Sequence, residues 1–329
     1  MNRALRLLRR RAVGSIPVLL IVVVLTFLLL EAAAGDAVDA YLLSIGGGDA
    51  AIAQSLRASY GLDQSMAARL WLYLSSLARL DLGWSVAFDR PVRDLILERL
   101  PNTLLLMGSA TALSFAIGSA LGIVAGAKPG SGRDRVLSTL SLVLYAIPSF
   151  WLGLVLSILF AVQLRWLPTS GIETIASGRT GLSRAADIAA HLALPVATLT
   201  LVYMALFLRV MRAGMAEVWG LDFVLFAQSK GLSRARIVLR HVARNALLPL
   251  VTMLGLQSAA MLGGSVVIES IFAIPGFGRL AQEAVSGRDT ALLTGIIVTS
   301  AVLVILVNLA IDIVYAALDP RVGASERSA

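Results

Sequence analysis

The residue types that carry most protein chemistry are scarce in this chain. It has no cysteine, and its two histidines, His191 and His241, lie far apart in the sequence. Neither belongs to an H-E-x-x-H pattern, and no G-x-S-x-G nucleophile turn occurs. Disulfides and thiol chemistry are therefore excluded, and a zinc site or an intramembrane enzyme is disfavoured. We expect no catalytic residue and no metal site, and no residue pattern identifies a substrate-binding site.

The sequence also shows no nucleotide-binding motif and no central carboxylate that could couple transport to an energy source. The glycine-rich stretch from Gly126 to Arg133 has the wrong spacing for a P-loop and no following Lys-Ser, so we interpret it as a short turn. No ATP site and no cofactor are expected on this chain. Asp312 lies about two turns from one end of its apolar segment, and Glu269 lies near the end of another. Neither carboxylate is central, which disfavours coupling to an ion gradient, and the roles of both stay open.

One polar segment, from Asp222 to Pro249, lies between two apolar ones. It reads DFVLFAQSKGLSRARIVLRHVARNALLP. Asp222 can cap a short helix that runs to Lys230. Gly231 can end that helix in a left-handed conformation. Ser233 can cap a second helix, from Arg234 to Asn245.

This pattern predicts two short helices joined by a glycine elbow, with Pro249 at the entry to the next apolar segment. Cations line the elbow and the second helix, at Lys230, Arg234, Arg236, Arg240 and Arg244. A compact polar loop without catalytic residues is a candidate docking surface for a cytoplasmic partner. A basic cytoplasmic loop that contains a glycine turn and does nothing more is the alternative.

Composition places most of the chain in a membrane. Of its 329 residues, 58% are hydrophobic and only 15% are charged, whereas soluble domains have about a quarter charged residues. The net charge of +8 is typical of basic cytoplasmic loops rather than of nucleic-acid binding. Continuous apolar runs without alternation favour helices over a barrel.

Six apolar segments are long enough to cross a bilayer core of about 30 Å, which takes roughly 20 residues. They are Ala12–Leu30, Thr103–Ala127, Val136–Gln163, Leu192–Val210, Leu250–Ser270 and Ala291–Leu318. The third contains Pro148, where we expect a kink or a split. The sequence therefore predicts an all-α polytopic membrane protein with about six transmembrane helices.

The distribution of arginine and lysine predicts the orientation. The run Arg9-Arg10-Arg11 precedes the first apolar segment, and further cations concentrate at 128–135 and 209–249. By the positive-inside rule these parts are cytoplasmic, and so are both termini. The first apolar run exceeds the length usual for a signal peptide, so an uncleaved anchor is favoured over a cleaved signal.

We interpret residues 1–329 as one transmembrane domain. It comprises a basic tail and first span (1–30), an external region (31–102) and core helices (103–329) that include a cytoplasmic loop (211–249). Within the external region, Arg69 to Leu80 predicts an amphipathic helix lying against the membrane or a partner. Its aromatic residues Trp71 and Tyr73 suit the membrane interface.

The polar loop resembles the EAA loop of ABC importer permeases. The resemblance rests on Ala227-x-x-x-Gly231 and on His241-x-x-Arg244-Asn245-Ala246-Leu247-Leu248-Pro249. The wider chain is similar to the dipeptide/oligopeptide/nickel permeases, in the branch with a large first external loop. The motifs include Gly61-Leu62-Asp63-Gln64, Asp81-Leu82-Gly83-Trp84-Ser85, Pro148-Ser149-Phe150-Trp151, Ile274-Pro275-Gly276-Phe277-Gly278 and Asp319-Pro320-Arg321.

This resemblance implies a type I ABC importer permease fold and a coupling helix that sits in a groove of a separate ATPase. Gly231 would supply the sharp turn, and the cations would add electrostatic specificity. The residues expected to couple the chain to the ATPase are Asp222, Phe223, Ala227, Lys230, Gly231, Leu232, Arg236, Arg240, Asn245 and Pro249.

The resemblance also implies partners and a location. A second permease, identical or different, would complete the pore, two P-loop ATPases would bind ATP and Mg²⁺, and an external binding protein would deliver substrate. The complex would lie in the plasma membrane, which is the inner membrane of a bacterium. Di- or oligopeptides are the expected cargo, with nickel complexes, opines or sugars as alternatives. An autonomous secondary transporter or pore is the competing class.

Two places depart from the family pattern. Ala34-Gly35-Asp36-Ala37 stands where a Pro-Gly-Asp-Pro string is common, and Gln228 and Ser229 replace the more usual Arg-Ala pair. Neither departure changes the family resemblance, but the second leaves the docking contacts of the loop less defined.

Overall fold

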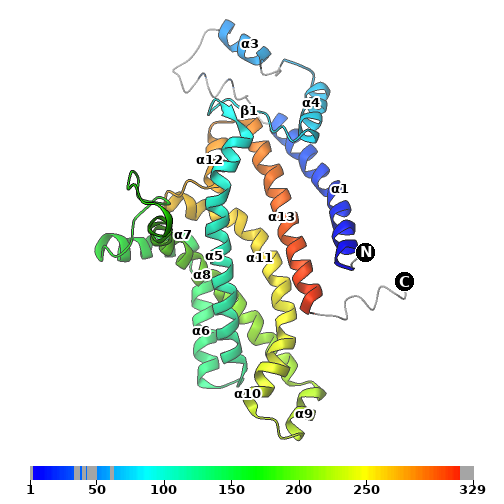
Figure 1. The fold of residues 1–329 in the computed structure, drawn as a ribbon, viewed down its shortest axis with the longest axis vertical. Coiled ribbons are helices and arrows are strands. Elements are labelled where there is room, and N and C mark those ends of the chain that lie inside the picture. Colours follow the sequence, from blue (N-terminus) through cyan, green and yellow to red (C-terminus); the bar gives the residue numbers. More distant parts are fainter. Residues whose placement is uncertain (1–2, 33–37, 39–41, 43–49, 60–62, 319–329) are drawn as a thin grey trace. The chain divides into compact units, whose positions relative to one another are not determined.

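A computed structural model describes all of the chain except residues 1–2, 33–37, 39–41, 43–49, 60–62 and 319–329. The motifs at 34–37 and 319–321 and the C-terminal tail therefore lie outside the described residues. The described part is almost entirely helical (Figure 1), as expected for an apolar chain whose backbone polar groups must pair internally in lipid.

The elements follow in chain order, with α for α-helices, η for π-helices and β for strands. They are α1 (Arg3–Glu31), α3 (Ala50–Ser59), α4 (Met66–Ala78), β1 (Trp84–Ser85), β2 (Arg90–Pro91), α5 (Val92–Gly126), α6 (Gly132–Ala146), α7 (Ser149–Leu156), η1 (Ser157–Gln163), α8 (Gly181–Trp219), α9 (Asp222–Ser229), α10 (Arg234–Arg236), η2 (Ile237–Val242), α11 (Ala243–Ile271), α12 (Phe277–Ser286) and α13 (Thr290–Leu318).

The chain divides into two compact units. One comprises residues 1–103 and 275–306, and the other comprises 104–274 and 307–329. Helices α5 and α13 each contribute residues to both units. The candidate docking loop belongs entirely to the second unit.

The first unit has its core where the start of α5 meets α12 and the start of α13. The buried side chains there are Val92, Leu95, Ile96, Phe277, Leu280, Ala284, Leu292 and Ile296. The short antiparallel hairpin of β1 and β2 is fastened to α13 by buried Asp289, whose carboxylate accepts from Ser85 Oγ at 2.6 Å and from the Leu292 backbone N–H at 2.9 Å. One carboxylate therefore caps α13 and positions the hairpin.

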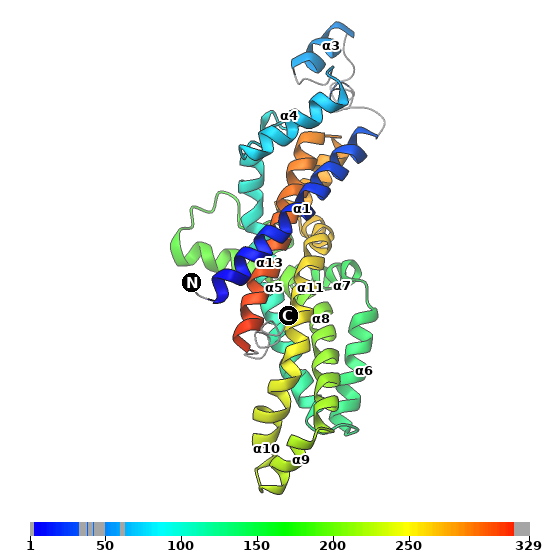
Figure 2. The ribbon, with the colours of Figure 1, turned by 90° about the vertical axis from the view of Figure 1, so that its right-hand side faces the viewer.

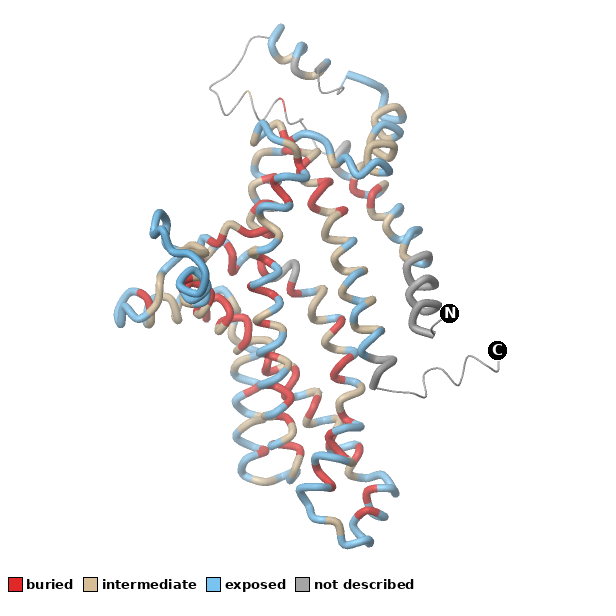
Figure 3. The backbone as a smooth tube through the Cα atoms, viewed as in Figure 1, coloured by how far each residue is buried: buried red, intermediate tan, exposed pale blue. Residues whose placement is uncertain are grey.

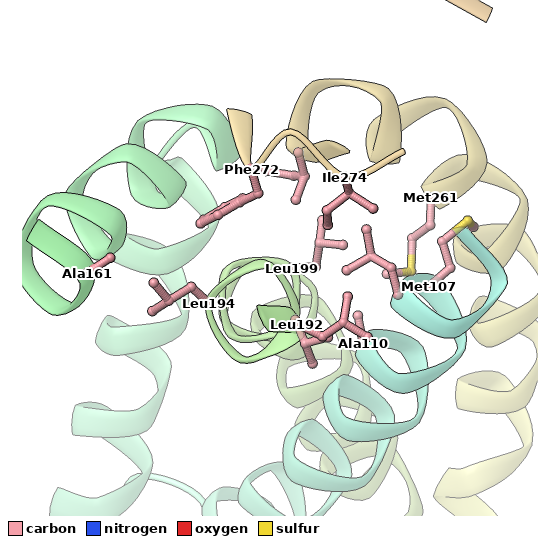
Figure 4. Close-up of a cluster of buried hydrophobic side chains, with 12 residues drawn as sticks. Met107, Ala110, Ala161, Leu192, Leu194, Leu199, Met261, Phe272 and Ile274 are labelled. Atoms are coloured by element: carbon pink, nitrogen blue, oxygen red, sulfur yellow. The ribbon is translucent and has the colours of Figure 1, made fainter. Parts of the chain in front are cut away.

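The second unit is built around α8, the most buried of the membrane-length helices in the described residues. Helices α6 and α11 pack along it (Figure 2). One apolar cluster joins α5, α8, α11 and the turn that follows α11, and it includes Met107, Leu199, Met261, Phe272 and Ile274 (Figure 4). A second cluster lies towards the end of α8 that precedes α9, and the docking loop contributes to it.

Helix α5 approaches α8 closely because three glycines face it. A Cβ added at Gly122 would lie only 2.5 Å from Cβ of Met211, and Gly118 and Gly126 are similarly close to Phe207 and Met215. Small residues are favoured where membrane helices pack closely. The glycine spacing therefore sets the distance between α5 and α8.

Four helices of the described residues are long and apolar enough to cross a membrane: Val92–Gly126, Gly181–Trp219, Arg234–Met261 and Thr290–Val314. A bent pair makes a fifth candidate, and Gly14–Leu29 is a shorter apolar helix. Four of the expected apolar segments lie within α1, α8, α11 and α13, and the segment Thr103–Ala127 lies in α5 except for its last residue. Several of these helices start earlier than the segments do. For example, α5 begins at Val92 rather than at Thr103, because its first turns bury Val92, Leu95 and Ile96 while exposing Asp94 and Glu98.

The third expected span is not one straight helix. It splits at Pro148 into α6 and α7–η1, which are bent by 97°. Ile147 has an extended backbone with ψ 126°, the conformation that a following proline favours. The expected break at Pro148 is therefore confirmed, and it takes the form of a split into two helices.

The loop between η1 and α8 is anchored by a buried carboxylate. Asp187 accepts from the Thr174 backbone N–H at 2.7 Å and from Thr174 Oγ1 at 2.9 Å, and it pairs with Arg179. These contacts hold the loop on the first turns of α8 and leave Ile175 almost fully exposed.

The amphipathic helix expected from Arg69 to Leu80 corresponds to α4, which begins three residues earlier. Ser65 caps it by accepting the Ala68 backbone N–H at 3.4 Å. Leu80 follows the helix with φ +60°, which ends the helical run.

Candidate functional site

Helix α9 has one buried side and one exposed apolar side. Val224 and Ala227, three residues apart and thus on one face, are buried in the second-unit cluster. Leu225 and Phe226 point outward, and Phe226 is 61% exposed. Exposed apolar side chains that lie together form a candidate contact surface. The exposed apolar residues of the α9 surface are Leu221, Phe223, Leu225 and Phe226.

The start of α9 differs from the expectation in one detail. Asp222 was expected to cap the helix, but it is the first helical residue, and Leu221 holds the cap position without a side-chain bond. The Val224 backbone N–H donates to the Leu221 carbonyl at 3.0 Å, so the backbone turn starts one residue earlier. Asp222 instead lies in the first turn, where a carboxylate is favourable towards the helix dipole.

Gly231 ends α9 as expected. Its φ is +71°, and its N–H donates to the Gln228 carbonyl at 2.9 Å. Nothing lies within 4 Å of a Cβ added there. The glycine is therefore required by the left-handed backbone alone and not by crowding.

Beyond the elbow, the expected second helix does not stop at Asn245. Ser233 occupies the cap position without a side-chain bond, and helical structure continues through α10, η2 and α11 to Ile271. Asn245 Nδ2 donates to the His241 carbonyl at 2.6 Å from within this helix. Pro249 is an interior residue of α11 rather than a boundary, which membrane helices tolerate.

The α9 surface has a rigid base. Ile237, Val238 and Val242 of η2 pack with Met211, Met215 and Val218 of α8 beneath α9, so red buried positions alternate with exposed ones along this part of the chain (Figure 3). A buried apolar base fixes α9 to two long helices.

An aromatic and a cationic side chain connect the docking loop to the turn between α5 and α6. Trp219 Nε1 donates to the Gly126 carbonyl at 2.8 Å, and Arg234 Nη2 donates to the Ala127 carbonyl at 3.0 Å. The Arg234 guanidinium also lies 5.9 Å from the Trp219 ring centroid, a cation–π distance. Beside these contacts is an open groove of about 550 Å³ lined by Pro129, Trp219, Gln228, Leu232, Arg234 and Ile237.

An ion pair that sequence reasoning missed supports the same turn. Asp134, only 2% exposed, accepts from Arg212 Nη2 at 2.9 Å and from the Gly130 backbone N–H at 2.8 Å. Ser131 caps α6 by accepting the Asp134 backbone N–H at 3.3 Å. The Ser-x-x-Asp spacing is a capping-box signal that could have identified this helix start.

The expected coupling residues therefore divide into two groups. Ala227 is buried and acts as packing, and Leu232 lines the groove. The exposed ones are Asp222, Phe223, Lys230, Gly231, Arg236, Arg240, Asn245 and Pro249. Lys230 lies with Nζ 4.3 Å from the Phe226 ring centroid. The exposed apolar side chains of Leu221, Leu225 and Phe226 are not among the expected residues, because the face that α9 exposes depends on which side packs on η2.

No group of three or more potential metal ligands occurs among the described residues. His191 is a buried residue of α8, and its Nδ1 lies 2.9 Å from the carbonyl oxygen of Asp187, one turn earlier in the same helix. These contacts are structural.

Comparison with known families matches two adjacent parts of the chain. The family described as "Binding-protein-dependent transport system inner membrane component" matches residues 118–324. The N-terminal part of a binding-protein-dependent transport system membrane component matches residues 4–107. Together these matches cover both units and the whole loop from Asp222 to Pro249.

Relatives align over almost the full length. The chain is 37% identical over 318 residues to the oligopeptide transport system permease protein AppB of Bacillus subtilis (strain 168), covering 95% of this chain and 98% of the relative. It is 36% identical over 313 residues to the glutathione transport system permease protein GsiC of Escherichia coli (strain K12), covering 95% and 97%. A putative peptide transport system permease protein of Brucella abortus (strain 2308) is 36% identical over 316 residues, covering 96% and 98%.

A solved structure shares the fold. An inward-facing conformation of the MetNI methionine ABC transporter superposes with a TM-score of 0.55 at 18% identity, covering 68% of this chain and 96% of that chain. At this identity the likeness concerns the fold alone.

Proposed function

This chain belongs to the family of binding-protein-dependent transport system inner membrane components, and we propose that it forms one half of the pore of an importer for di- or oligopeptides. It is a permease subunit of an ABC importer and a multi-pass plasma membrane protein. The family implies ATPase and substrate-binding partners. Relatives named for oligopeptide, peptide and glutathione transport support the peptide cargo. Nickel complexes, opines and sugars are the alternative cargoes.

The α9 surface is the observation that carries the mechanism. An exposed apolar helix flanked by cations, on a rigid base, suits a groove on an ATPase subunit. When two ATPases close on ATP and Mg²⁺, this helix would move with them. Because helical structure runs without interruption from Arg234 to Ile271, the movement would reach α11 and switch the access of the pore.

The same proposal includes an arrangement in the membrane. We propose six crossings, formed by α1, α5, the bent pair α6 and α7–η1, α8, α11 and α13, with both termini in the cytoplasm. The apolar lengths of the four long helices and the cations at Lys128, Arg133, Arg135 and around α9 support it. A second permease completes the pore, and ATP hydrolysis takes place on the partner subunits.

Affinity purification from native membranes tests this proposal. The tagged chain in mild detergent should recover P-loop ATPases and a second permease, identified by mass spectrometry. Phe226→Asp and Leu225→Asp should lose the ATPases, because a carboxylate in an apolar contact must be desolvated. Ala235→Asp adds the same charge at an exposed position beyond the elbow and should retain them. A solitary chain in several detergents would instead favour an autonomous transporter or pore.

Reconstitution then tests the cargo. Vesicles that contain the recovered complex and its substrate-binding protein should take up a labelled dipeptide only with ATP. The purified chain alone should show no uptake. Uptake of a nickel complex or a sugar in place of the peptide would assign the alternative cargo, and uptake by the chain alone would refute the coupled mechanism.

A further inference from the structure

Helix α4 presents an apolar side that nothing in its own unit covers. Trp71 is 72% exposed, and Leu72 beside it is also exposed. Its sequence, MAARLWLYLSSLA, contains a single charged residue. A large aromatic residue at this exposure is unfavourable in water, since its burial removes some 150–250 Å² from solvent.

The opposite side of α4 packs on α1. The rings of Phe27 and Tyr73 stack with centroids 6.2 Å apart and an interplanar angle of 21°. Phe27 lies four residues before Glu31, the last residue of α1, which corresponds to about 6 Å along the axis. The middle of α4 is therefore level with the last turns of the apolar part of α1.

Helix α1 itself exposes apolar residues over the same length. Ile21, Leu25, Leu28 and Leu29 are exposed on it and precede Glu31. A helix that crosses a bilayer meets the headgroup layer where its apolar run ends. If α1 crosses the membrane, as proposed above, the contact between Phe27 and Tyr73 lies at the edge of the hydrocarbon core.

We propose that α4 is an interfacial helix that lies in the headgroup layer of the bilayer, with Trp71 and Leu72 inserted towards the lipid chains. Tryptophan concentrates at this depth because its ring is amphipathic. Exposed Arg79, directly after the helix, suits the level of the lipid phosphates. The contact between Tyr73 and Phe27 places α4 beside the end of the apolar run of α1, and this depth favours lipid over a protein as the covering partner.

Spin labels on single cysteines test this placement. The native chain has no cysteine, so Trp71→Cys and Leu72→Cys each carry one label without further changes. The full chain is reconstituted in vesicles of phosphatidylethanolamine and phosphatidylglycerol. Relaxation by oxygen, which partitions into lipid, is compared with relaxation by a water-soluble nickel chelate. Ile21→Cys provides the lipid reference, and Asp63→Cys, exposed in the turn before α4, provides the aqueous reference.

We expect labels at 71 and 72 to favour oxygen over nickel, as at 21 and opposite to 63. Nickel accessibility like that at 63 would place α4 in water and overturn the inference. Exclusion of both reagents would show that a protein covers the helix, and it would also overturn the inference. This inference rests on the proposed crossing by α1. A nickel-accessible label at 21 would therefore refute that crossing, whereas a failure of peptide uptake would leave the measurement unchanged.

Discussion

Ala227 and Gly231 belong to the same short motif, but they act through different physical effects. Ala227 is buried against η2 and α8, where its small size lets α9 approach. A Cβ added at Gly231 would contact no other atom, so the glycine is needed only for its φ of +71°. The spacing of a small residue and a glycine therefore encodes one packing constraint and one backbone constraint.

Enlarging Ala227 should destabilise the protein. Ala227→Leu adds volume to a packed core and should cost about 1–3 kcal/mol. Thermal unfolding in detergent should show a lower midpoint for this variant. Ala235→Leu, which makes the same change at an exposed helical position, should unfold like the native chain. Equal midpoints for the two variants would contradict the inward orientation of Ala227.

Replacing Gly231 separates geometry from contact. Gly231→Pro fixes φ near −65° and removes the N–H that bonds to Gln228, so ATP-driven uptake should be lost while membrane insertion is normal. Gly231→Asn should retain uptake, because asparagine tolerates the left-handed conformation. Normal uptake by the proline variant would count against a coupling role for the elbow.

At the scale of elements, the turn between α5 and α6 is fastened twice to α8. The ion pair of Asp134 with Arg212 holds the start of α6. Trp219 and Arg234 donate to the carbonyl groups of Gly126 and Ala127, at and just after the end of α5. The docking loop and this turn therefore form one structural block. The turn was expected to be a simple cytoplasmic connection.

Breaking the ion pair should loosen this block. Arg212 is 38% exposed, so solvent screening reduces the effect, and Asp134→Asn should cost about 1–3 kcal/mol. Combining it with Arg212→Gln should cost less than the sum of the single changes, since the two side chains share one interaction. The readout is the unfolding midpoint of the three variants in detergent. Additive losses would show that the pair does not couple the two helices.

At the scale of the whole molecule, the proposed orientation puts the two ends of α8 on opposite sides of the membrane. With 39 residues, α8 is long enough to exceed a core of about 30 Å. Ile175 precedes it and Ser233 follows it, and both are exposed. The cations around α9 predict that the Ser233 side is cytoplasmic.

Cysteine labelling tests this sidedness in a chain without native cysteines. In intact spheroplasts, a membrane-impermeant maleimide should react with Ile175→Cys and not with Ser233→Cys. Permeabilisation should expose Ser233→Cys to the reagent. The reverse pattern would invert the topology and would place α9 out of reach of a cytoplasmic ATPase.

The sequence by itself predicted the class of the protein, the apolar segments and the family. These depend on local properties: continuous apolar runs require helices in lipid, and ordered short motifs identify relatives. The left-handed elbow at Gly231 and the break at Pro148 were also predictable, because glycine and proline restrict the backbone wherever they occur.

Only the tertiary structure decided what packs against what. The side of α9 that faces outward depends on how α9 packs on η2 and α8. The sequence did not show that Ala227 would be buried there or that Leu225 and Phe226 would be exposed. The pairing of Asp134 with Arg212 joins residues 78 positions apart. The passage of α11 through Pro249 also required its neighbours, because a helix can continue past a proline only where the surrounding packing stabilises it.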